Sequence, residues 1–344
     1  MRLYDYIRDN KTYIIAEMSG NHGGDINKAL EIVRAAADAG ADCLKIQTYT
    51  ADTITIDCKS EFFEVKSGLW KNEYLYDLYK KAYTPWEWTK IIMDEAHLHG
   101  MDFLSTPFDF NAVDFLENVG VEFYKIASFE IVDIPLLRRV ARTGKPLIMS
   151  CGMASQEEIK EAVDTIRQEE NDKIVLLKCC SAYPTDYKTM NLRTIVDMRE
   201  KYGVPVGLSD HSIGTLTDIM AVSMGAVVIE KHICLTREDK TVDGAFSLDK
   251  NEFKQMVDDV RNAELSMGKV SYGPSEDEKQ SYAHRRSLFA VKDIKKGELF
   301  TQDNIKSIRP ACGLHTRYYD ELINGRKAKR DIVFGTPLSW EDVE

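Results

Sequence analysis

Two lysines lie inside apolar runs of the sequence, where a charged side chain needs a partner. Lys45 stands in CLKIQTY, which begins at Cys43, and Lys125 stands in FYKIAS, which begins at Phe123. An unpaired ammonium group is strongly disfavoured in a low-dielectric interior, so each lysine implies a nearby anion. Serines at the ends of such runs could add neutral donors for a phosphate or a carboxylate, and they are Ser105, Ser128, Ser150 and Ser209.

Two interpretations of these lysines are open. In the first, they form a structural ion-pair network with Glu17, Glu130 or Glu230, and for one lysine alone this is favoured because such networks are common. In the second, they bind an anionic ligand. Two inward-facing lysines and four serines around one rim favour the anion site.

Two histidines are spaced as ligands of one metal ion would be. His211 and His232 are 21 residues apart, about one βα unit, so we expect them to close adjacent strands about 5 Å apart. Neutral imidazoles with carboxylate and water oxygens suit a divalent cation such as Mn²⁺, Co²⁺ or Zn²⁺. His97 and His99, just before Gly100, lie near a predicted helix end and are interpreted as residues outside the site.

Other polar residues fall at the same strand ends. Alternation places Lys45 and Gln47 on one face of their strand, and Glu230 and His232 on one face of theirs. Asp210 is given equal weight as a metal ligand and as a residue that orients a loop or caps the next helix.

Asp243 and the cysteines near the rim each allow two interpretations. Asp243, in TVDGAFSLD, either faces the pocket or forms a turn with Gly244. A thiol nucleophile would need a paired base, and the sequence supplies no obvious one. We therefore interpret three rim cysteines as buried packing residues: Cys151, Cys179 and Cys180.

Eight short apolar runs alternate with amphipathic stretches from residue 13 to about residue 265, which is typical of repeated βα units. The runs are YIIAEMS from Tyr13, CLKIQTY from Cys43, DFLSTPF from Asp102, FYKIAS from Phe123, LIMSCG from Leu147, IVLLKC from Ile174, PVGLSD from Pro205 and VVIEKHI from Val227. Eight such units in about 250 residues predict an α/β fold, a (β/α)8 TIM barrel, with a doubly wound sheet as the alternative. In such a barrel the chemistry lies at the carboxyl ends of the strands, where these polar residues fall.

Helices are predicted over residues 26–40, 155–170 and 251–268. The second opens with a capping box formed by Ser155 and Glu158. Residues 51–84 are too many for a simple βα connection, so they are interpreted as a lid or binding element.

The pattern changes after Gly268. Residues 1–268 are predicted to form the barrel, and residues 269–286, which are polar and contain Gly273-Pro274, a linker. Residues 287–344 contain short alternating runs separated by turns and are predicted to form a small, mostly β domain.

Composition excludes several classes of protein. The chain has 344 residues, 44% hydrophobic content and a formal net charge of -11, whereas nucleic-acid and anionic-membrane surfaces need a basic face. No signal-peptide pattern opens the chain, and no window approaches the roughly 20 apolar residues of a membrane span. Seven cysteines without a CxxC pair suit a reducing compartment. We therefore predict a cytoplasmic protein that binds neither nucleic acid nor membranes.

Taken in order, the segments at the strand ends resemble the sialic acid synthase family. The matching segments are AEMSGNHGGDINKA, LKIQTY, LSTPFD, YKIASFE, MSCGMAS, SAYPT with NL, VGLSDHSIGT, IEKHICL and the terminal KSIRPACGL. They cover nearly the whole chain. Within the family, YDLYKKAYTPWEW, AFSLD and GLHTRYY look like the pseudaminic acid synthase branch.

The resemblance implies an enzyme that condenses phosphoenolpyruvate with an open-chain amino sugar. For the pseudaminic acid branch the sugar is 2,4-diacetamido-2,4,6-trideoxy-altrose, and the products are a nonulosonic acid and phosphate. The family uses a divalent metal, for which we expect Mn²⁺, with Co²⁺ or Mg²⁺ as alternatives. It also implies a homodimer in which the terminal antifreeze-like (SAF) domain of one subunit caps the barrel of the other.

The resemblance also suggests roles for individual residues. Those expected to position or deprotonate the attacking water are Glu17, Gln47 and Asp243. Those expected to bind phosphoenolpyruvate are Lys45, Lys125, Ser128, Ser150, Ser181 and Ser209. Those expected to contact the sugar are Glu130, Tyr183 and Arg309, the last of these across the dimer. The metal would be held by His211 and His232, where it would polarise the sugar aldehyde as a Lewis acid.

Departures from the family pattern and competing functions remain. The N-acetylneuraminate branch commonly has asparagine where Ser181 stands, and a threonine-glycine pair where Cys151-Gly152 stands. The first change alters a hydrogen-bond donor near the expected phosphoenolpyruvate site. Alternatives are an N-acetylneuraminate or legionaminate synthase, and a barrel aldolase or deoxy-sugar-acid synthase that also uses phosphoenolpyruvate. A carbohydrate-binding protein without catalysis is the alternative from a different class, but it leaves the lysines and the paired histidines unexplained.

Overall fold

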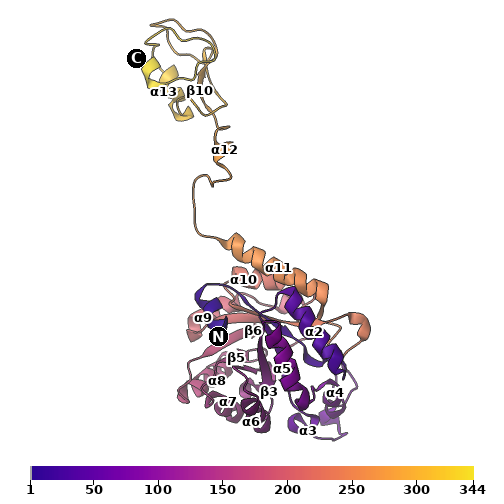
Figure 1. Ribbon diagram of the computed structural model, residues 1–344. Helices are drawn as coiled ribbons and strands as arrows, with labels where there is room; N and C mark the ends of the chain where they lie inside the picture. Colours follow the sequence, from indigo (N-terminus) through magenta and orange to yellow (C-terminus); the bar gives the residue numbers. More distant parts are fainter. Residues whose placement is uncertain (1) are drawn as a thin grey trace. The chain divides into compact units, whose positions relative to one another are not determined.

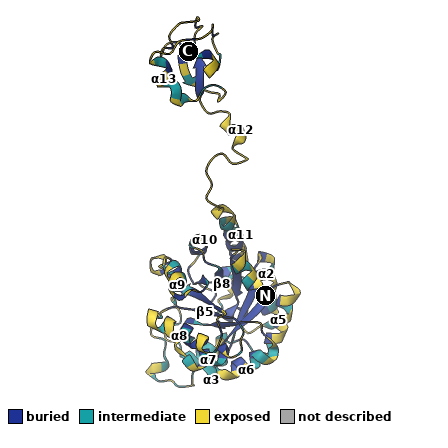
Figure 2. Cartoon of the chain, turned by 90° about the vertical axis from the view of Figure 1, so that its left-hand side faces the viewer, coloured by how far each residue is buried: buried dark blue, intermediate teal, exposed yellow. Residues whose placement is uncertain are grey.

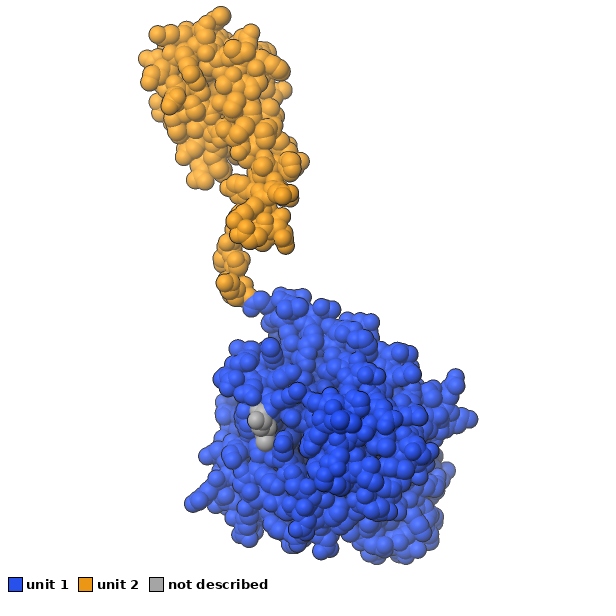
Figure 3. Space-filling model, in the orientation of Figure 1, with its two compact units in different colours: residues 1–268 blue, residues 269–344 orange. Residues whose placement is uncertain are grey.

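The computed structural model describes residues 2–344 of the chain. These residues belong to two compact units, residues 1–268 and residues 269–344, which Figure 3 distinguishes by colour. The first unit holds the strand–helix repeats, and the second is a small domain with its own core.

Eight parallel strands form a closed sheet in chain order, because β1 pairs with both β2 and β8. The strands are β1 (Tyr13–Glu17), β2 (Cys43–Thr48), β3 (Asp102–Pro107), β4 (Tyr124–Ile126), β5 (Leu147–Ser150), β6 (Ile174–Cys179), β7 (Val206–Asp210) and β8 (Val228–Cys234). A short strand, β9 (Leu248–Asp249), pairs with the end of β8. All eight predicted runs are confirmed as strands. The TIM barrel is also confirmed, because a doubly wound sheet would leave its two edge strands unpaired.

A helix follows each barrel strand and lies outside the sheet (Figure 1). These helices are α2 (Ile26–Ala39), α5 (Thr89–Leu98), α6 (Phe110–Val119), α7 (Ile134–Ala141), α8 (Gln156–Gln168), α9 (Thr194–Tyr202), α10 (Leu216–Ser223) and α11 (Lys250–Met267). Asp25 and Asp109 cap α2 and α6 by accepting hydrogen bonds from backbone N–H groups of the first turn. The predicted capping box of Ser155 and Glu158 is confirmed at the start of α8.

Alternation along the strands separates two apolar layers. One fills the barrel interior and contains Tyr13, Ile15, Cys43, Leu104, Phe123, Ile148, Val175, Leu177 and Val228. The residues between them face outward and pack against the helices, whose solvent-facing sides are exposed (Figure 2). Polar residues that follow these inward-facing positions by two along the same strand also face inward, and they lie at the carboxyl end of the barrel.

The amino-terminal end of the barrel is closed by a separate ion pair. α1 (Arg2–Arg8) precedes β1, and its Tyr6 hydroxyl donates to the carboxylate of Asp42 at 2.6 Å. The same carboxylate accepts hydrogen bonds from the backbone N–H of Ile14 at 2.9 Å and from the Arg261 guanidinium at 2.8 Å. This group joins β1, the start of β2 and α11.

Residues 51–84 form an excursion between β2 and α5, as their length predicts. It contains α3 (Ala51–Ile54) and α4 (Leu75–Ala82). The Trp70 indole N–H donates to the carbonyl oxygen of Val242 at 3.1 Å, which ties the excursion to the segment that follows β8.

The second unit is built mainly from turns, bridges and one antiparallel strand pair. β10 (Ser287–Ala290) pairs with β11 (Ile305–Ile308), and the helices are α12 (Lys279–Tyr282) and α13 (Tyr319–Ile323). Its core consists of Leu288, Ala290, Ile294, Phe300, Ile305, Leu322, Ala328, Ile332 and Leu338. Across residues 2–344, no helix has the length and apolar character needed to cross a membrane.

Gly207 on β7 gives a test of how tightly the barrel is closed. A Cβ at this position would lie 2.3 Å from the carbonyl oxygen of Val228 and 2.8 Å from Leu177 Cδ2, and neither atom is free to move away. We expect Gly207→Ala to destabilise the barrel by about 1–3 kcal/mol, measured as a shift of the urea unfolding transition. Gly120→Ala is the comparison, because it meets no atom within 4 Å and changes only a left-handed backbone position. An unchanged transition for Gly207→Ala would contradict this packing.

Candidate active site

Four buried charged side chains meet at the carboxyl end of the barrel. Lys45 contacts the carboxylate of Glu17 and lies 3.5 Å from that of Glu230. Lys125 lies 3.6 Å from Glu230 and donates a hydrogen bond to the carbonyl oxygen of Ile126 at 3.2 Å. In the described residues no ion pair joins either lysine to Glu130. The ion-pair interpretation thus holds for two of its three carboxylates, but Lys125 has only a long contact to one of them.

Burial and charge act against each other in this group, which we call the lysine–glutamate cluster (Glu17, Lys45, Lys125 and Glu230). Burial raises the pKa of the Glu17 carboxyl above its ordinary value, although Lys45 opposes the shift. Burial would also raise the pKa of Glu230, but Lys125 and Lys45 outweigh it and hold that pKa below its ordinary value. Glu17 is therefore the carboxylate of the cluster that takes up a proton more readily.

A chain of hydrogen bonds links the three residues expected to handle water. The Gln47 amide donates to Glu17 at 2.9 Å and to the Ser19 hydroxyl at 3.0 Å. Ser19 in turn donates to the carboxylate of Asp243, which burial gives a raised pKa. Asp243 therefore faces this group, which answers the alternative of a simple turn with Gly244. The sequence did not single out Ser19, whose φ of 47° places its hydroxyl between the two carboxylates.

The serines expected to bind phosphoenolpyruvate lie on the same end of the barrel. A Cβ on Gly152 would come within 2.3 Å of the Ser181 hydroxyl and 2.8 Å of the Ser128 hydroxyl, so this glycine lets both serines approach. The buried hydroxyl of Ser150 has no hydrogen-bond partner within the described residues. Ser209 donates to Glu230 at 3.4 Å.

Ser105 does not line the predicted anion site. Its hydroxyl lies 2.7 Å from that of Thr48 and donates to the carbonyl oxygen of Ile46, in the layer behind the barrel wall. Thr106 occupies the inward position of β3 instead, in step with Leu104 of the interior core. The prediction failed because both residues close the same run and only their alternation separates them.

The two histidines lie side by side, as their spacing predicts. The ring centroids of His211 and His232 are 5.3 Å apart. The Nδ1–H of His211 donates to the carbonyl oxygen of Cys180 at 3.1 Å, because a carbonyl can only accept, and Nε2 therefore carries the lone pair in the neutral ring. Burial lowers the pKa of His232 well below its ordinary value, which keeps that imidazole neutral.

These imidazoles fit a divalent metal in part. Nδ1 of His232 is buried without a hydrogen-bond partner in residues 2–344, and neutral rings are the form that binds a metal. The described residues contain no group of three or more histidine, cysteine, aspartate or glutamate side chains arranged around one metal position. A metal held by this pair would therefore take its remaining ligands from water or substrate oxygen.

Asp210 orients a loop. Its carboxylate accepts hydrogen bonds from the backbone N–H of Ser212 at 2.8 Å and from the Thr217 hydroxyl at 2.7 Å, and it contacts Lys231. All of these partners lie on the outer side of the barrel wall, away from His232. The loop interpretation of Asp210 therefore holds, and the metal-ligand interpretation does not.

Cys179 has a neighbour that the sequence did not reveal. Its sulfur lies 3.8 Å from Nδ1 of His211, because Cys179 on β6 pairs in register with Ser209 on β7. Burial would raise the pKa of the thiol, but His211 outweighs it and lowers the pKa to about 7. By contrast, burial raises the pKa of Cys151 to about 12. The interpretation of the rim cysteines as simple packing residues holds for Cys151 and is incomplete for Cys179.

Aromatic rings surround the histidine pair. The ring of Tyr183 lies 4.5 Å from that of His211, and the ring of Phe246 lies 4.9 Å from that of His232, measured between centroids. Trp70 from the excursion reaches Tyr183 at 5.6 Å. Trp70 and Phe246 were not predicted, since isolated aromatic residues in connecting segments carry no periodic signal.

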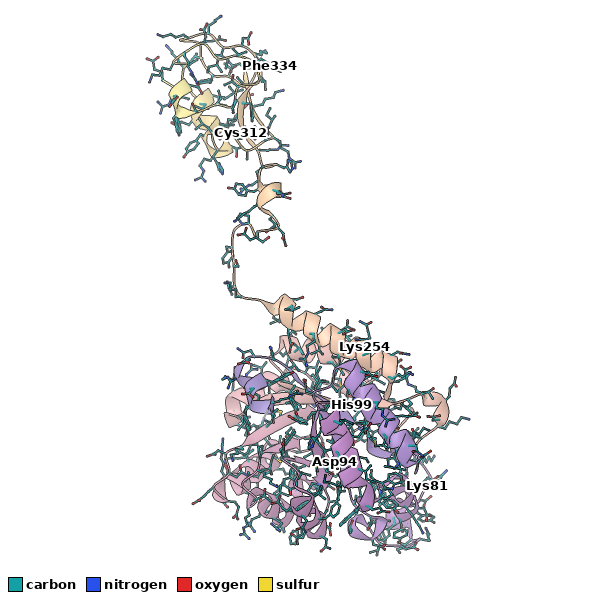
Figure 4. The ribbon with its side chains drawn as sticks, viewed as in Figure 1. Lys81, Asp94, His99, Lys254, Cys312 and Phe334 are labelled. Carbon is teal, nitrogen blue, oxygen red and sulfur yellow. The ribbon has the colours of Figure 1, made fainter. Side chains whose placement is uncertain are left out.

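Other predicted residues lie around or outside this group. Glu130 follows β4, and one of its buried carboxylate oxygens has no hydrogen-bond partner in the described residues. Arg309 belongs to the second unit. His97 and His99 are exposed near the end of α5, as predicted. Figure 4 shows His99 among the outer helices.

Glu130 should make the stability of the unliganded barrel depend on pH. Burial raises the pKa of its carboxyl to about 7 from an ordinary value of 4.5, so between these values the folded state holds a proton that the unfolded chain releases. This contribution to stability is present at low pH and is lost as pH rises through about 7. Glu130→Gln should remove that loss. The free energy of unfolding of the variant in urea, relative to that of the natural chain, should therefore increase from pH 5 to pH 8. Glu31→Gln, at an exposed position, is the control, and a constant difference for Glu130→Gln would contradict the prediction.

Comparisons with known proteins place this arrangement in a family. The NeuB family model matches residues 32–272, and the SAF domain model matches residues 285–344. A pseudaminic acid synthase of Campylobacter jejuni is 45% identical over 342 residues, covering 99% of both chains, and one of Helicobacter pylori is 43% identical over 333 residues, covering 96% of this chain and 97% of that one. The crystal structure of an N-acetylneuraminic acid synthetase from Leptospira borgpetersenii superposes with a TM-score of 0.70 at 32% identity, covering 79% of this chain and 90% of that one. The chain belongs to the NeuB family and carries a SAF domain.

Proposed function

We propose that this chain condenses phosphoenolpyruvate with 2,4-diacetamido-2,4,6-trideoxy-altrose, giving pseudaminic acid and phosphate. The observation that carries the proposal is the meeting of two buried ammonium groups, Lys45 and Lys125, with the histidine pair at one end of the barrel. Identity above 40% to pseudaminic acid synthases along nearly the full chain favours this sugar over those of the other branches.

Phosphoenolpyruvate would bind through its two anionic groups. Lys45 and Lys125 supply positive charge where the interior dielectric makes it strong. Four serines add uncharged donors for the phosphate and carboxylate oxygens: Ser128, Ser150, Ser181 and Ser209. Two of these groups are most available to such a ligand. The Ser150 hydroxyl has no hydrogen-bond partner in the described residues, and the Lys125 ammonium group has only a long contact to Glu230 there.

The reaction forms one carbon–carbon bond and one carbon–oxygen bond, the latter to water, and it breaks the carbon–oxygen bond to phosphate. The methylene carbon of phosphoenolpyruvate attacks the sugar aldehyde, whose oxygen gains a proton, and water adds to the adjacent carbon that becomes electron-poor. The resulting tetrahedral intermediate expels phosphate and leaves the 2-keto acid. Glu17, with its raised pKa, accepts the water proton, while Gln47 and the Ser19–Asp243 pair orient that water.

The metal in this proposal is a divalent cation, Mn²⁺ first, with Co²⁺ or Mg²⁺ as alternatives. His211 through Nε2 and His232 would hold it. When bound, the metal supplies Lewis-acid polarisation of the aldehyde oxygen. The protein contributes the His211 ring, which its hydrogen bond to Cys180 orients before a ligand arrives, and the His232 ring, which burial keeps neutral.

The sugar would meet a surface that is partly apolar. A trideoxy sugar with two acetamido groups presents methyl groups where a hydroxylated hexose presents polar ones, and the rings of Trp70, Tyr183 and Phe246 suit methyl groups. Glu130 would accept a hydrogen bond from an acetamido N–H or a hydroxyl group.

Arg309 would reach the acetamido carbonyl from the partner subunit in a homodimer. Within the second unit it lines a cavity of about 690 Å³ together with Arg285 and Arg286. The other lining residues in the described part of the chain include no carboxylate, so these guanidinium groups face a cavity without a competing anion. Dimerisation with exchanged SAF domains is thus part of the proposal. The cytoplasmic location stays a prediction.

The decisive test supplies Mn²⁺ and phosphoenolpyruvate with one of three sugars. These are the altrose derivative, the 2,4-diacetamido-trideoxy-mannose analogue and N-acetylmannosamine. We expect phosphate release with the altrose derivative, at the highest kcat/KM of the three, and a product of the mass of pseudaminic acid. Preference for the mannose analogue or N-acetylmannosamine would replace the assignment with a legionaminate or N-acetylneuraminate synthase. No phosphate release with any sugar would favour a carbohydrate-binding protein.

The histidine pair makes a separate prediction. His211→Ala and His232→Ala should reduce phosphate release to the background rate while the circular dichroism spectrum stays that of a folded barrel. His99→Ala, on the outer surface, is the matched control and should keep the natural rate. Full activity after exhaustive chelation of divalent metals would contradict the role given to this pair.

A further inference from the structure

We propose that Lys231 is a positioning residue that fixes the His211 ring from behind the barrel wall, through the loop of residues 210–214. The proposal rests on the function proposed above, in which His211 serves the reaction. Lys231 itself contacts neither substrate nor metal. No role in the condensation was assigned to it from the sequence.

Lys231 lies on the opposite face of β8 from the catalytic groups. Glu230 and His232 face the barrel interior, so alternation sends the intervening side chain outward, toward α10. The Lys231 side chain is 0% exposed, as are those of its two carboxylate neighbours, Asp210 and Asp218. An ammonium group is thus enclosed between the barrel wall and a helix.

The ammonium group binds the loop that carries His211. It contacts the carboxylate of Asp210 and donates to the carbonyl oxygens of Ser212 at 2.8 Å and Gly214 at 3.0 Å. These acceptors lie on both sides of His211 along the chain. One side chain therefore holds the loop at its beginning and its end.

Asp210 restrains the same loop. It accepts hydrogen bonds from the backbone N–H of Ser212 at 2.8 Å and from the Thr217 hydroxyl at 2.7 Å, so the loop is also fastened to the first turn of α10. On the inner side, His211 has two further restraints. Its carbonyl oxygen accepts from the backbone N–H of Thr185 at 3.0 Å, and its ring donates to Cys180.

The position of Lys231 in the sheet lets it fix the two imidazoles relative to each other. It pairs in register with Asp210 on β7 and directly precedes His232 on β8. The hydrogen bonds of its ammonium group therefore fix the end of β7 relative to the end of β8, and with it the separation of the two rings.

Stability alone does not explain a buried lysine at this place. A buried ion pair is often no more stabilising than apolar residues of similar size, because both charges lose their hydration. The lysine ammonium group donates to three acceptors and so fixes their positions relative to one another, which an apolar side chain cannot do. Geometry is thus the property that Lys231 contributes.

The first experiment measures Mn²⁺ binding without turnover. Full-length Lys231→Met is titrated with Mn²⁺ alone, and free Mn²⁺ is read from its electron paramagnetic resonance signal. We expect Kd to rise by about 10- to 100-fold, the range seen when groups that orient a metal ligand are removed. The affinity for phosphoenolpyruvate in the absence of metal, measured by calorimetry, should change less than about twofold, because the lysine–glutamate cluster is untouched.

A second variant separates positioning from folding. Lys231→Met leaves Asp210 buried without its cation, and the variant could fail for that reason alone. Lys231→Met combined with Asp210→Asn removes this pair of charges, and Asp218 can stay protonated because burial raises its pKa well above the ordinary value. The double variant should recover most of the unfolding free energy, yet still bind Mn²⁺ weakly. Arg261→Met is the matched control: it removes the cation of the Asp42 ion pair at the other end of the barrel and should leave Mn²⁺ affinity unchanged.

A third readout does not depend on the metal or on the reaction. In protein labelled with ¹⁵N at histidine, the ring nitrogens of His211, assigned with His211→Gln, report which nitrogen carries the proton. At a pH where the ring is neutral, the natural chain should show the Nδ1–H form, and the double variant a mixture of both tautomers. If the natural chain binds no Mn²⁺ and releases no phosphate, the proposed function fails, while this spectrum still decides the role of Lys231. Natural Mn²⁺ affinity or an unchanged His211 spectrum in the double variant would overturn the proposal.

Discussion

The rest of the site depends on one shared carboxylate, that of Glu230, between two buried ammonium groups. The apolar layer inside the barrel closes it from below, so water cannot reach these charges from that side. Lys45 has Glu17 as a second partner, whereas within residues 2–344 Lys125 has only Glu230 and a backbone carbonyl. Lys125 is therefore the less fully neutralised of the two lysines, and burial, which disfavours its charged form, lowers its pKa below the ordinary value. An anion that binds beside Lys125 would supply the partner that the protein itself provides only at long range.

Much of the fold followed from local patterns. Each of the eight strands is a continuous apolar run, and a closed parallel sheet with helices outside is the arrangement that buries such runs on both faces. Alternation along β2 and β8 also placed Lys45 with Gln47 and Glu230 with His232 on the inner face. The contact between His211 and His232 could be predicted because their spacing in the sequence equals one strand–helix repeat.

What could not be predicted depends on contacts between distant segments. Ser19 joins Gln47 to Asp243 only because its backbone adopts a left-handed conformation, which no pattern around it signals. Trp70 reaches Tyr183 across more than 100 residues of chain, through a loop whose path the sequence leaves open. The nearness of Cys179 to His211 required the register of β6 and β7. Ser105 was misplaced because a one-position error along a strand exchanges the two faces of the wall.

The three consecutive residues from 230 to 232 serve both sides of the barrel wall at once. An insertion or a deletion of one residue within β8 would send Lys231 into the interior and turn its two neighbours toward α10. Homologues of this chain should therefore differ in length outside the strands, and the excursion of residues 51–84 and the segment between the two units are the places where extra or missing residues can be accommodated. The wall thus ties the spacing of the scaffold to the placement of the groups that face the interior.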